Sequence, residues 1–200
     1  MNTSQISSAL RSDPVTSKKF LGVFPANRLP KVIKSYPNGF IANTDISGKP
    51  GSHWVAFYFP SERKAEFFDS YGQSPETYHK FFRDYLKHYD WDFNARKLQS
   101  IWTDVCGQYC IFYLSQRVRG HCMSRIVSIF DDNTVENCMS MARFPFCTVL
   151  KCFPVLHISG VKSKQYKAKP FRNSHDQFHF RRSKTFFQCQ QIVIEMLLCI

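Results

Sequence analysis

The stretch HWVAFYFPSERKAEFFDSYG (residues 53–72) decides the fold predicted for this chain. Its first part, 53–59, is rich in aromatic and β-branched residues, which favours a β-strand, and its last part, 65–72, has a similar character. PSERK (60–64) lies between them and has the composition of a turn, so the two segments are expected to pair as an antiparallel hairpin. The first segment is almost entirely apolar, which is typical of a strand covered on both faces.

Segments before and after the hairpin predict further strands and a helix. FLGVF (20–24) is short and apolar, and GFIAN (39–43) has the composition of a strand. After the hairpin, Ser74 and Pro75 suit the N-cap and the first position of a helix. That helix is expected to run over 75–89, where apolar residues recur at helical spacing.

A last strand and helix are expected around LQSIWTDVCGQYC (98–110). KLQSIW (97–102) has strand character, and a helix should begin near Val105 or Cys106 and stop at Gly120. Together these elements predict an α+β fold, in which a mixed central sheet packs against helices.

The composition points to an intracellular protein of one or two domains. Of its 200 residues, 44% are hydrophobic and 16% aromatic, which is enough to build a core. No run approaches the roughly 18 to 20 apolar residues that span a bilayer, and the N-terminus lacks the pattern of a secretory signal. We therefore expect a nuclear or cytoplasmic location and no membrane association. The eight cysteines should then be thiols, catalytic groups or metal ligands rather than disulfides.

A basic balance suggests DNA or another polyanion as a partner. The net charge is +12, and nine of the 27 lysines and arginines lie in residues 151–200 beside only Asp176 and Glu195. A solvated basic tail is the simpler interpretation, and electrostatic binding of nucleic acid is the alternative. The candidates for nucleic-acid contacts are Lys162, Lys164, Lys167, Lys169, Arg181 and Arg182.

Four residues could supply the chemistry of a cysteine hydrolase. Cys106 would be the nucleophile, and its thiol pKa could be lowered by His53 and by the helix N-terminus. Asp69, on the returning strand of the hairpin, could orient the imidazole. The amide of Gln99 and the backbone N–H of Cys106 could stabilise the oxyanion that forms in acyl transfer. This chemistry requires no cofactor and no metal.

Each of these residues also has a structural interpretation. Taken alone, Cys106 could be a small buried hydrophobe and His53 a core histidine. Asp69 could be a turn residue that hydrogen-bonds its own backbone. Asp104 is a rival for the catalytic acid, although its position favours an N-cap of the second helix. Cys110, one turn after the nucleophile candidate, is expected in the core.

From about residue 18 to residue 120, the chain resembles the adenovirus endopeptidase (adenain-like) family of cysteine proteases. In that family a His-Trp pair opens a strand, an acid lies on the next strand, and a Gln precedes a Cys-Gly pair by seven positions. The related ubiquitin-like-protein proteases share the His-Trp and Cys-Gly elements, usually with a Gln-to-Cys gap one residue shorter. The matching residues in this chain are His53, Trp54, Asp69, Gln99, Cys106 and Gly107.

The resemblance implies a thiol endopeptidase of the adenain or ubiquitin-like-protease fold type. It assigns His53, Asp69 and Cys106 to a triad and Gln99 to the oxyanion hole. It also suggests cleavage after glycine, with viral precursors or ubiquitin-like proteins as substrate classes, and an origin in a virus-like DNA transposon. The alternative is a catalytically inactive transposon-derived protein that binds nucleic acid through its basic C-terminal region.

The expected organisation has three parts. A polar and loosely ordered segment, 1–19, precedes a cysteine protease domain, 20–140, and a basic C-terminal region of unpredicted structure, 141–200, follows it.

The chain departs from the resembled family in two respects. The adenoviral enzymes carry Glu where this chain has Asp69, although other relatives use Asp. The adenoviral enzyme is activated by a peptide that is disulfide-linked to a cysteine upstream of the oxyanion Gln. This chain has no cysteine before Cys106, so we do not expect activation of that kind. DNA also stimulates the viral enzyme, and the basic balance is compatible with that.

The cysteines and histidines of residues 147–179 do not predict a zinc finger. The spacing between the two cysteines and that between the two histidines would suit zinc, but the gap between the cysteine pair and the histidine pair is nearly twice the usual dozen residues. The residues concerned are Cys147, Cys152, His175 and His179.

Overall fold

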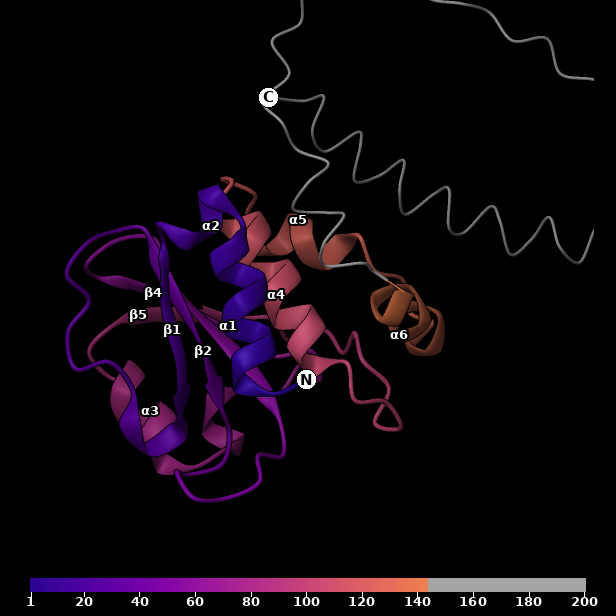
Figure 1. Cartoon of the computed structure of the whole chain (residues 1–200), viewed down its shortest axis with the longest axis horizontal. Coiled ribbons are helices and arrows are strands. Elements are labelled where there is room, and N and C mark those ends of the chain that lie inside the picture. The colour runs from indigo at the N-terminus through magenta and orange to yellow at the C-terminus, as the bar shows by residue number, and fades with distance from the viewer. Residues whose placement is uncertain (144–200) are drawn as a thin grey trace, which may run out of the picture. The chain divides into compact units, whose positions relative to one another are not determined.

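Figure 1 presents a computed structural model of the chain, in which residues 1–143 are described. Most of the basic C-terminal region therefore lies outside the described residues, together with the cysteine and histidine set at 147–179. The predicted nucleic-acid contacts lie outside them as well, namely Lys162, Lys164, Lys167, Lys169, Arg181 and Arg182. Within the described part, no helix is long and apolar enough to cross a membrane.

A five-stranded mixed sheet forms the centre of the described part. Its strands follow the order β1-β2-β3-β4-β5; the two outer pairings are parallel and the two inner pairings antiparallel. The strands are β1 (Phe20–Pro25), β2 (Asn38–Asn43), β3 (Trp54–Phe59), β4 (Lys64–Phe68) and β5 (Asp90–Phe93). The predicted hairpin and the two strands before it are thereby confirmed.

Helices cover the two faces of the sheet, so the predicted α+β class with a mixed central sheet is confirmed. The α-helices are α1 (Thr3–Ser12), α2 (Pro14–Ser17), α3 (Lys80–Leu86), α4 (Cys106–Arg117), α5 (Met123–Ser128) and α6 (Thr134–Arg143). Two short 3-10 helices, η1 (Ala26–Arg28) and η2 (Pro75–Thr77), lie in the connections. Figure 1 shows α1 and α4 side by side over the sheet.

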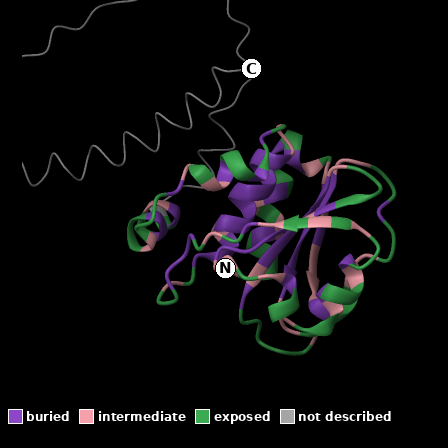
Figure 2. Cartoon of the chain, turned by 180° about the vertical axis from the view of Figure 1, so that it is seen from behind, coloured by how far each residue is buried: buried purple, intermediate pink, exposed green. Residues whose placement is uncertain are grey.

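The central strand β3 divides the core into two layers. Its side chains alternate, as those of a strand must. Ala56 and Tyr58 face the layer that contains α1 and α4, while Val55, Phe57 and Phe59 face the layer that contains α3. All five are buried, and Figure 2 shows this continuous buried band through the sheet and α4. The apolar run in the sequence therefore reflects burial on both faces, as predicted.

The N-terminal segment 1–19 is not loose as predicted, because two helices order it. Asn2 and Gln5 form a capping box in which each side chain accepts the other's backbone N–H at 2.9 Å. Ile6 and Leu10, one turn apart, are fully buried. The segment is mostly polar, so its composition did not indicate a helix. Its narrow apolar stripe is nevertheless sufficient to pack α1 against α4.

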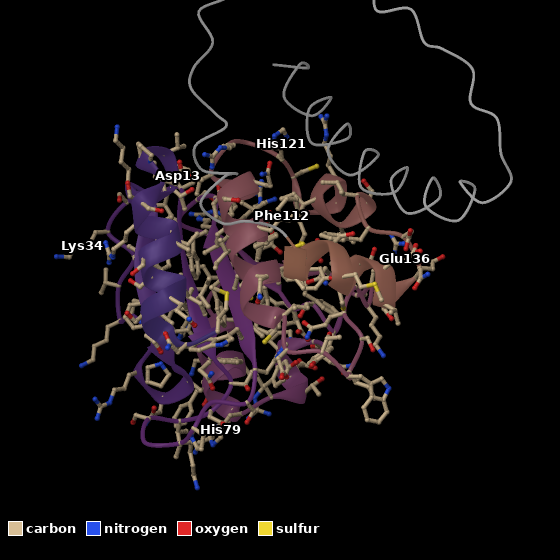
Figure 3. All side chains as sticks on the ribbon, turned by 45° about the vertical axis from the view of Figure 1, so that its right-hand side comes forward. Asp13, Lys34, His79, Phe112, His121 and Glu136 are labelled. Atoms are coloured by element: carbon tan, nitrogen blue, oxygen red, sulfur yellow. The ribbon has the colours of Figure 1, made fainter. Side chains whose placement is uncertain are left out.

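Asp13 anchors the N-terminal segment to the end of the α4 region (Figure 3). Its carboxylate caps α2 by accepting the backbone N–H groups of Val15 and Thr16, and it forms an ion pair with Arg119 at 2.9 Å. Burial raises the pKa of this carboxyl, but the bonds from Thr16 and the charge of Arg119 outweigh burial and lower it.

The helix predicted over 75–89 is interrupted. Ser74 Oγ accepts the N–H of Glu76 and caps η2, as its position predicts, but Tyr78 is extended, with φ −95° and ψ −167°. The chain resumes helical geometry only in α3. The break directs the Tyr78 hydroxyl to Asp69, at 2.8 Å, and helical periodicity cannot reveal such a tertiary bond.

The strand predicted at 97–102 is also wrong, since this segment is a loop. The N–H groups of Leu98 and Gln99 both donate to the carbonyl oxygen of Ser70, at 2.9 Å, which is incompatible with a regular ladder. The fifth strand is instead β5, whose sequence DWDF alternates charged and aromatic residues and pairs with β4 at the sheet edge.

Candidate active site

His53 and Asp69 meet at the end of the β3–β4 hairpin. The register pairs Ala56 with Phe68, and its continuation would place His53 and Asp69 as diagonal neighbours on one face. Accordingly, His53 Nε2 lies 2.6 Å from Asp69 Oδ1, and both side chains are buried. The hairpin alone therefore brings two of the four predicted site residues together.

The Asp69 carboxylate is held by several groups. Besides His53, it accepts the N–H of Tyr71 at 3.0 Å, the N–H of Gln73 at 2.9 Å and the hydroxyl of Tyr78 at 2.8 Å. The turn interpretation and the catalytic interpretation of Asp69 are thus both compatible with its contacts. A carboxylate that accepts this many bonds is fixed in orientation, and it fixes the imidazole in turn.

The backbone of Asp69 is held separately by Asn94, which follows β5. Asn94 Oδ1 accepts the Asp69 N–H at 2.8 Å, and Asn94 Nδ2 donates to the Asp69 carbonyl at 2.7 Å. The side-chain amide of Asn94 thus pairs with the backbone N–H and C=O of Asp69, as the backbone of a neighbouring strand would. The sequence revealed neither Asn94 nor Tyr78, because Asn94 lies 25 residues from Asp69 and Tyr78 falls within the helix predicted over 75–89.

Cys106 is the first residue of α4, as predicted, and the helix is docked against the start of β3. Cys110 Sγ, one turn along the helix, donates to the Trp54 carbonyl at 3.2 Å. Cys110 is fully buried in the core, which confirms the prediction for it. Since Trp54 follows His53, this contact brings the first turn of α4 to the imidazole.

The N-terminus of α4 has no side-chain cap. Val105 occupies the N-cap position without a capping hydrogen bond, and Asp104 is exposed, so the predicted N-cap role of Asp104 is wrong. The first turn of a helix has N–H groups with no intrahelical partner. At α4 these donors are therefore left for the Cys106 sulfur and for a ligand beside it.

An ion pair and a cation–π contact fix the other end of α4 to the sheet. Arg117 binds Glu66 of β4 through Nε at 2.6 Å and Nη2 at 2.7 Å, and Tyr113 donates to the same carboxylate at 2.6 Å. The Arg117 guanidinium also lies 4.3 Å from the ring centroid of Tyr58. These contacts join the helix that carries Cys106 to the strand that leads to Asp69.

The electrostatics of His53 and Cys106 are complementary. Burial lowers the pKa of His53, but the hydrogen bond with Asp69 and the interaction with Cys106 outweigh it and raise the pKa to about 9. Burial raises the pKa of Cys106, yet His53 and the N–H groups of Trp54 and Gly107 bring it below its ordinary value. Both shifts favour an imidazolium–thiolate pair.

The imidazole of His53 is available to the thiol through one nitrogen. Nε2 is engaged by Asp69, whereas Nδ1 is buried and makes no hydrogen bond of ordinary geometry with the described residues. Nδ1 is therefore the imidazole nitrogen that remains to exchange a proton with the Cys106 thiol.

Two tyrosine rings flank His53. Tyr71 stacks on the imidazole with ring centroids 4.5 Å apart, and Tyr78 lies nearly parallel to it at 6.0 Å. These contacts restrict rotation of the imidazole and exclude water from around it. Burial raises the pKa of both tyrosines, and Asp69 adds to the effect, so their hydroxyls stay protonated.

Gln99 is buried and is connected to His53 through Tyr71. Its Oε1 accepts from Ser70 Oγ at 2.7 Å, and its Nε2 donates to the Thr103 carbonyl at 2.5 Å and to the Tyr71 hydroxyl at 3.5 Å. Gln99 thus lies beside the ring that stacks on His53, but in a loop rather than in the predicted strand. Its amide donors are directed to protein groups.

A cavity of about 310 Å³ lies beside Trp54. It is lined by residues 1–3, the end of β1, the loop 45–51 and the Trp54 side chain. The Trp54 indole donates to the carbonyl of Met1 at 3.1 Å, which fixes the ring as one wall. None of the predicted site residues, His53, Asp69, Gln99 and Cys106, lines this cavity.

Among residues 1–143, no cluster of histidine, cysteine, aspartate or glutamate could hold a metal ion. The four described cysteines, Cys106, Cys110, Cys122 and Cys138, have free thiols.

Comparisons with known proteins show a similarity to a solved structure. No protein-family model matches the chain, and no curated protein matches it. Among solved structures, it is similar to the crystal structure of the selenomethionine form of the ASFV pS273R protease, with 21% identity and a TM-score of 0.45. The match covers 72% of this chain and 65% of that chain, slightly less than two thirds of its length.

Proposed function

We propose that the chain is a cysteine endopeptidase in which Cys106 is the nucleophile. The observation that carries the proposal is the position of His53: its Nε2 binds Asp69 at 2.6 Å, its buried Nδ1 has no hydrogen-bond partner among the described residues, and Cys106 is near enough to raise its pKa. This is the nucleophile–base–orienting-group arrangement of acyl transfer. The raised pKa of His53 and the lowered pKa of Cys106 support the same assignment.

The proposed reaction proceeds through a thioester. The Cys106 thiolate attacks the peptide carbonyl and forms a carbon–sulfur bond, and the His53 imidazolium gives its proton to the departing amine. His53, now neutral, accepts a proton from water as the water attacks the thioester. This releases the acid and restores the imidazolium–thiolate pair. Asp69 keeps the imidazole oriented and stabilises its charged form throughout.

Two kinds of donor are proposed to hold the oxyanion. The uncapped first turn of α4 offers the backbone N–H of Cys106. The Gln99 amide is the second donor, since its 3.5 Å contact with Tyr71 is at the limit of hydrogen bonding and can be exchanged for a substrate oxygen.

The proposed substrate is a protein or peptide. Cleavage after glycine, and a viral-type precursor or ubiquitin-like protein as substrate, are the finer proposals that the family resemblance suggests. An intracellular location is part of the proposal, since the free thiols of the described cysteines suit a reducing compartment.

Selective thiol labelling and peptide hydrolysis test the proposal. At neutral pH, iodoacetamide should modify Cys106 faster than the other cysteines, and Cys106→Ala should abolish hydrolysis while keeping the wild-type melting temperature. Cys122→Ala is the matched control, because it removes an exposed thiol outside the site. Undiminished hydrolysis by Cys106→Ala would refute the assignment.

The second candidate function is a protein without catalysis that binds nucleic acid, which the net charge of +12 favours. Uniform, slow labelling of all thiols, together with salt-dependent DNA binding, would support it. DNA binding that does not change with salt would count against an electrostatic role.

A further inference from the structure

The loop between Gln99 and Cys106 exposes two large apolar side chains beside the candidate site. Trp102 is 87% exposed and Ile101 is 62% exposed, and no other large hydrophobic side chain in residues 1–143 is as exposed as Trp102. One exposed apolar residue is ordinary, but a consecutive pair that includes a tryptophan leaves substantial apolar area in water.

Hydrogen bonds from Ser100 and Thr103, on either side of the apolar pair, fix the ends of this turn. Ser100 N–H and Thr103 Oγ1 both contact the sulfur of Cys138, at 3.3 and 3.2 Å, and Cys138 is buried on α6. Thr103 N–H closes the turn on the Ser100 carbonyl at 3.3 Å. Gln99 Nε2 holds the Thr103 carbonyl from the side of the site. The apolar pair is therefore presented on a fixed turn.

Chain connectivity places this pair close to the nucleophile. Trp102 precedes Cys106 by four residues, and an extended chain advances at most about 3.6 Å per residue, so their Cα atoms are within about 14 Å of each other. A bound polypeptide in extended form advances about 3.3 Å per residue. A substrate residue within about four positions of the scissile bond can therefore contact Trp102.

We propose that Ile101 and Trp102 form a docking surface for an apolar side chain of the polypeptide substrate, within about four residues of the scissile bond. The proposal rests on the proposed peptidase function. A substrate chain is the occupant because it must lie at Cys106, and the apolar pair continues that site along the same loop. A rigid indole on a fixed turn offers contact area at little cost in conformational entropy.

Hydrolysis of two peptides by the full chain tests the proposal. Both internally quenched peptides carry glycine before the scissile bond, and they differ only in having leucine or serine at the nearby positions on each side. Trp102→Ala should lower kcat/KM for the leucine peptide by about tenfold to a hundredfold, which corresponds to losing the burial of one large apolar side chain. Trp102→Phe should retain most of the rate.

The control variant is Val32→Ala, which removes a 70% exposed apolar side chain from the connection between η1 and β2. It should leave both peptides unaffected. Alkylation of Cys106 by iodoacetamide reports on the thiol alone and separates loss of docking from loss of the nucleophile. If the wild-type chain cleaves neither peptide, the same comparison is made by equilibrium binding of the leucine peptide to Cys106→Ala.

Three results would overturn the proposal. The first is an unchanged kcat/KM, or unchanged binding, of the leucine peptide in Trp102→Ala. The second is an equal loss for both peptides, since that effect would not be apolar recognition. The third is self-association in solution that Trp102→Ala abolishes without any change in hydrolysis, which would identify a second copy of the chain as the occupant.

Discussion

Asp69→Asn should remove the charge that keeps His53 protonated, while preserving the shape of the side chain. The hydrogen bond that His53 donates to Asp69 is the largest influence that raises the pKa of His53 from its ordinary 6.5 to about 9. A difference of this size corresponds to about 3 kcal/mol in favour of the imidazolium. Without the carboxylate, burial should leave His53 neutral at pH 7, and Cys106 should then revert towards an ordinary thiol.

The rate of Cys106 alkylation by iodoacetamide, followed from pH 5 to 10, measures this effect. In the wild-type chain, thiolate paired with imidazolium should react well below the ordinary thiol pKa of about 8.5. In Asp69→Asn the rising limb should move towards that value, and the rate at pH 7 should fall by about tenfold to a hundredfold. The fall should be about a hundredfold if Asp69 accounts for the whole 3 kcal/mol, and about tenfold if Cys106 also contributes to the raised pKa of His53.

Asp92→Asn is the matched control, because Asp92 is an exposed carboxylate on β5, outside the His53 network. It should leave the alkylation profile unchanged. An identical profile in wild type and in folded Asp69→Asn would refute the reasoning, since it would mean that the carboxylate does not set the charge of His53.

Three further substitutions test the groups that support the site. Tyr78→Phe removes the 2.8 Å hydrogen bond to Asp69, and because bonds to charged groups contribute about 1.5–3 kcal/mol to stability, the free energy of urea unfolding should fall by about that amount. The value of kcat/KM should fall as well, because the carboxylate that orients His53 is held less firmly; an unchanged kcat/KM would contradict this supporting role. Gly39→Ala should destabilise the fold by about 1–3 kcal/mol in urea unfolding, since the new Cβ would lie 2.8 Å from a backbone carbonyl oxygen of β3; an unchanged midpoint would contradict this close packing. Arg117→Ala leaves Glu66 without its cation and should cost about 3–5 kcal/mol in the same assay, whereas a cost below about 1 kcal/mol would show that solvent already screens the pair.

Local patterns predicted well wherever a short-range rule decides the conformation. The aromatic and β-branched composition of β3 and β4 and the turn between them are properties of residues adjacent in sequence, and so is the start of α4 at Cys106. The sequence therefore predicted that His53 and Asp69 would lie on neighbouring strands and that Cys106 would begin a helix.

Predictions failed where a contact between distant residues overrides local preference. The helix at 75–89 breaks so that Tyr78 can bond Asp69. The segment 97–102 is a loop because two of its N–H groups bond Ser70. The N-terminal segment is helical because Ile6 and Leu10 find an apolar surface on α4 and the sheet.

The sequence by itself determined which chemical groups are present and which of them share a strand pair or begin a helix, because side-chain periodicity is a local property of the backbone. Only the tertiary structure decided how these groups act on one another. Burial beside a carboxylate raises the pKa of His53, and the docking of Cys110 on Trp54 brings the thiol to the imidazole. Stacking by Tyr71 connects Gln99 to both. These effects depend on distance and solvent exclusion, which no stretch of sequence specifies alone.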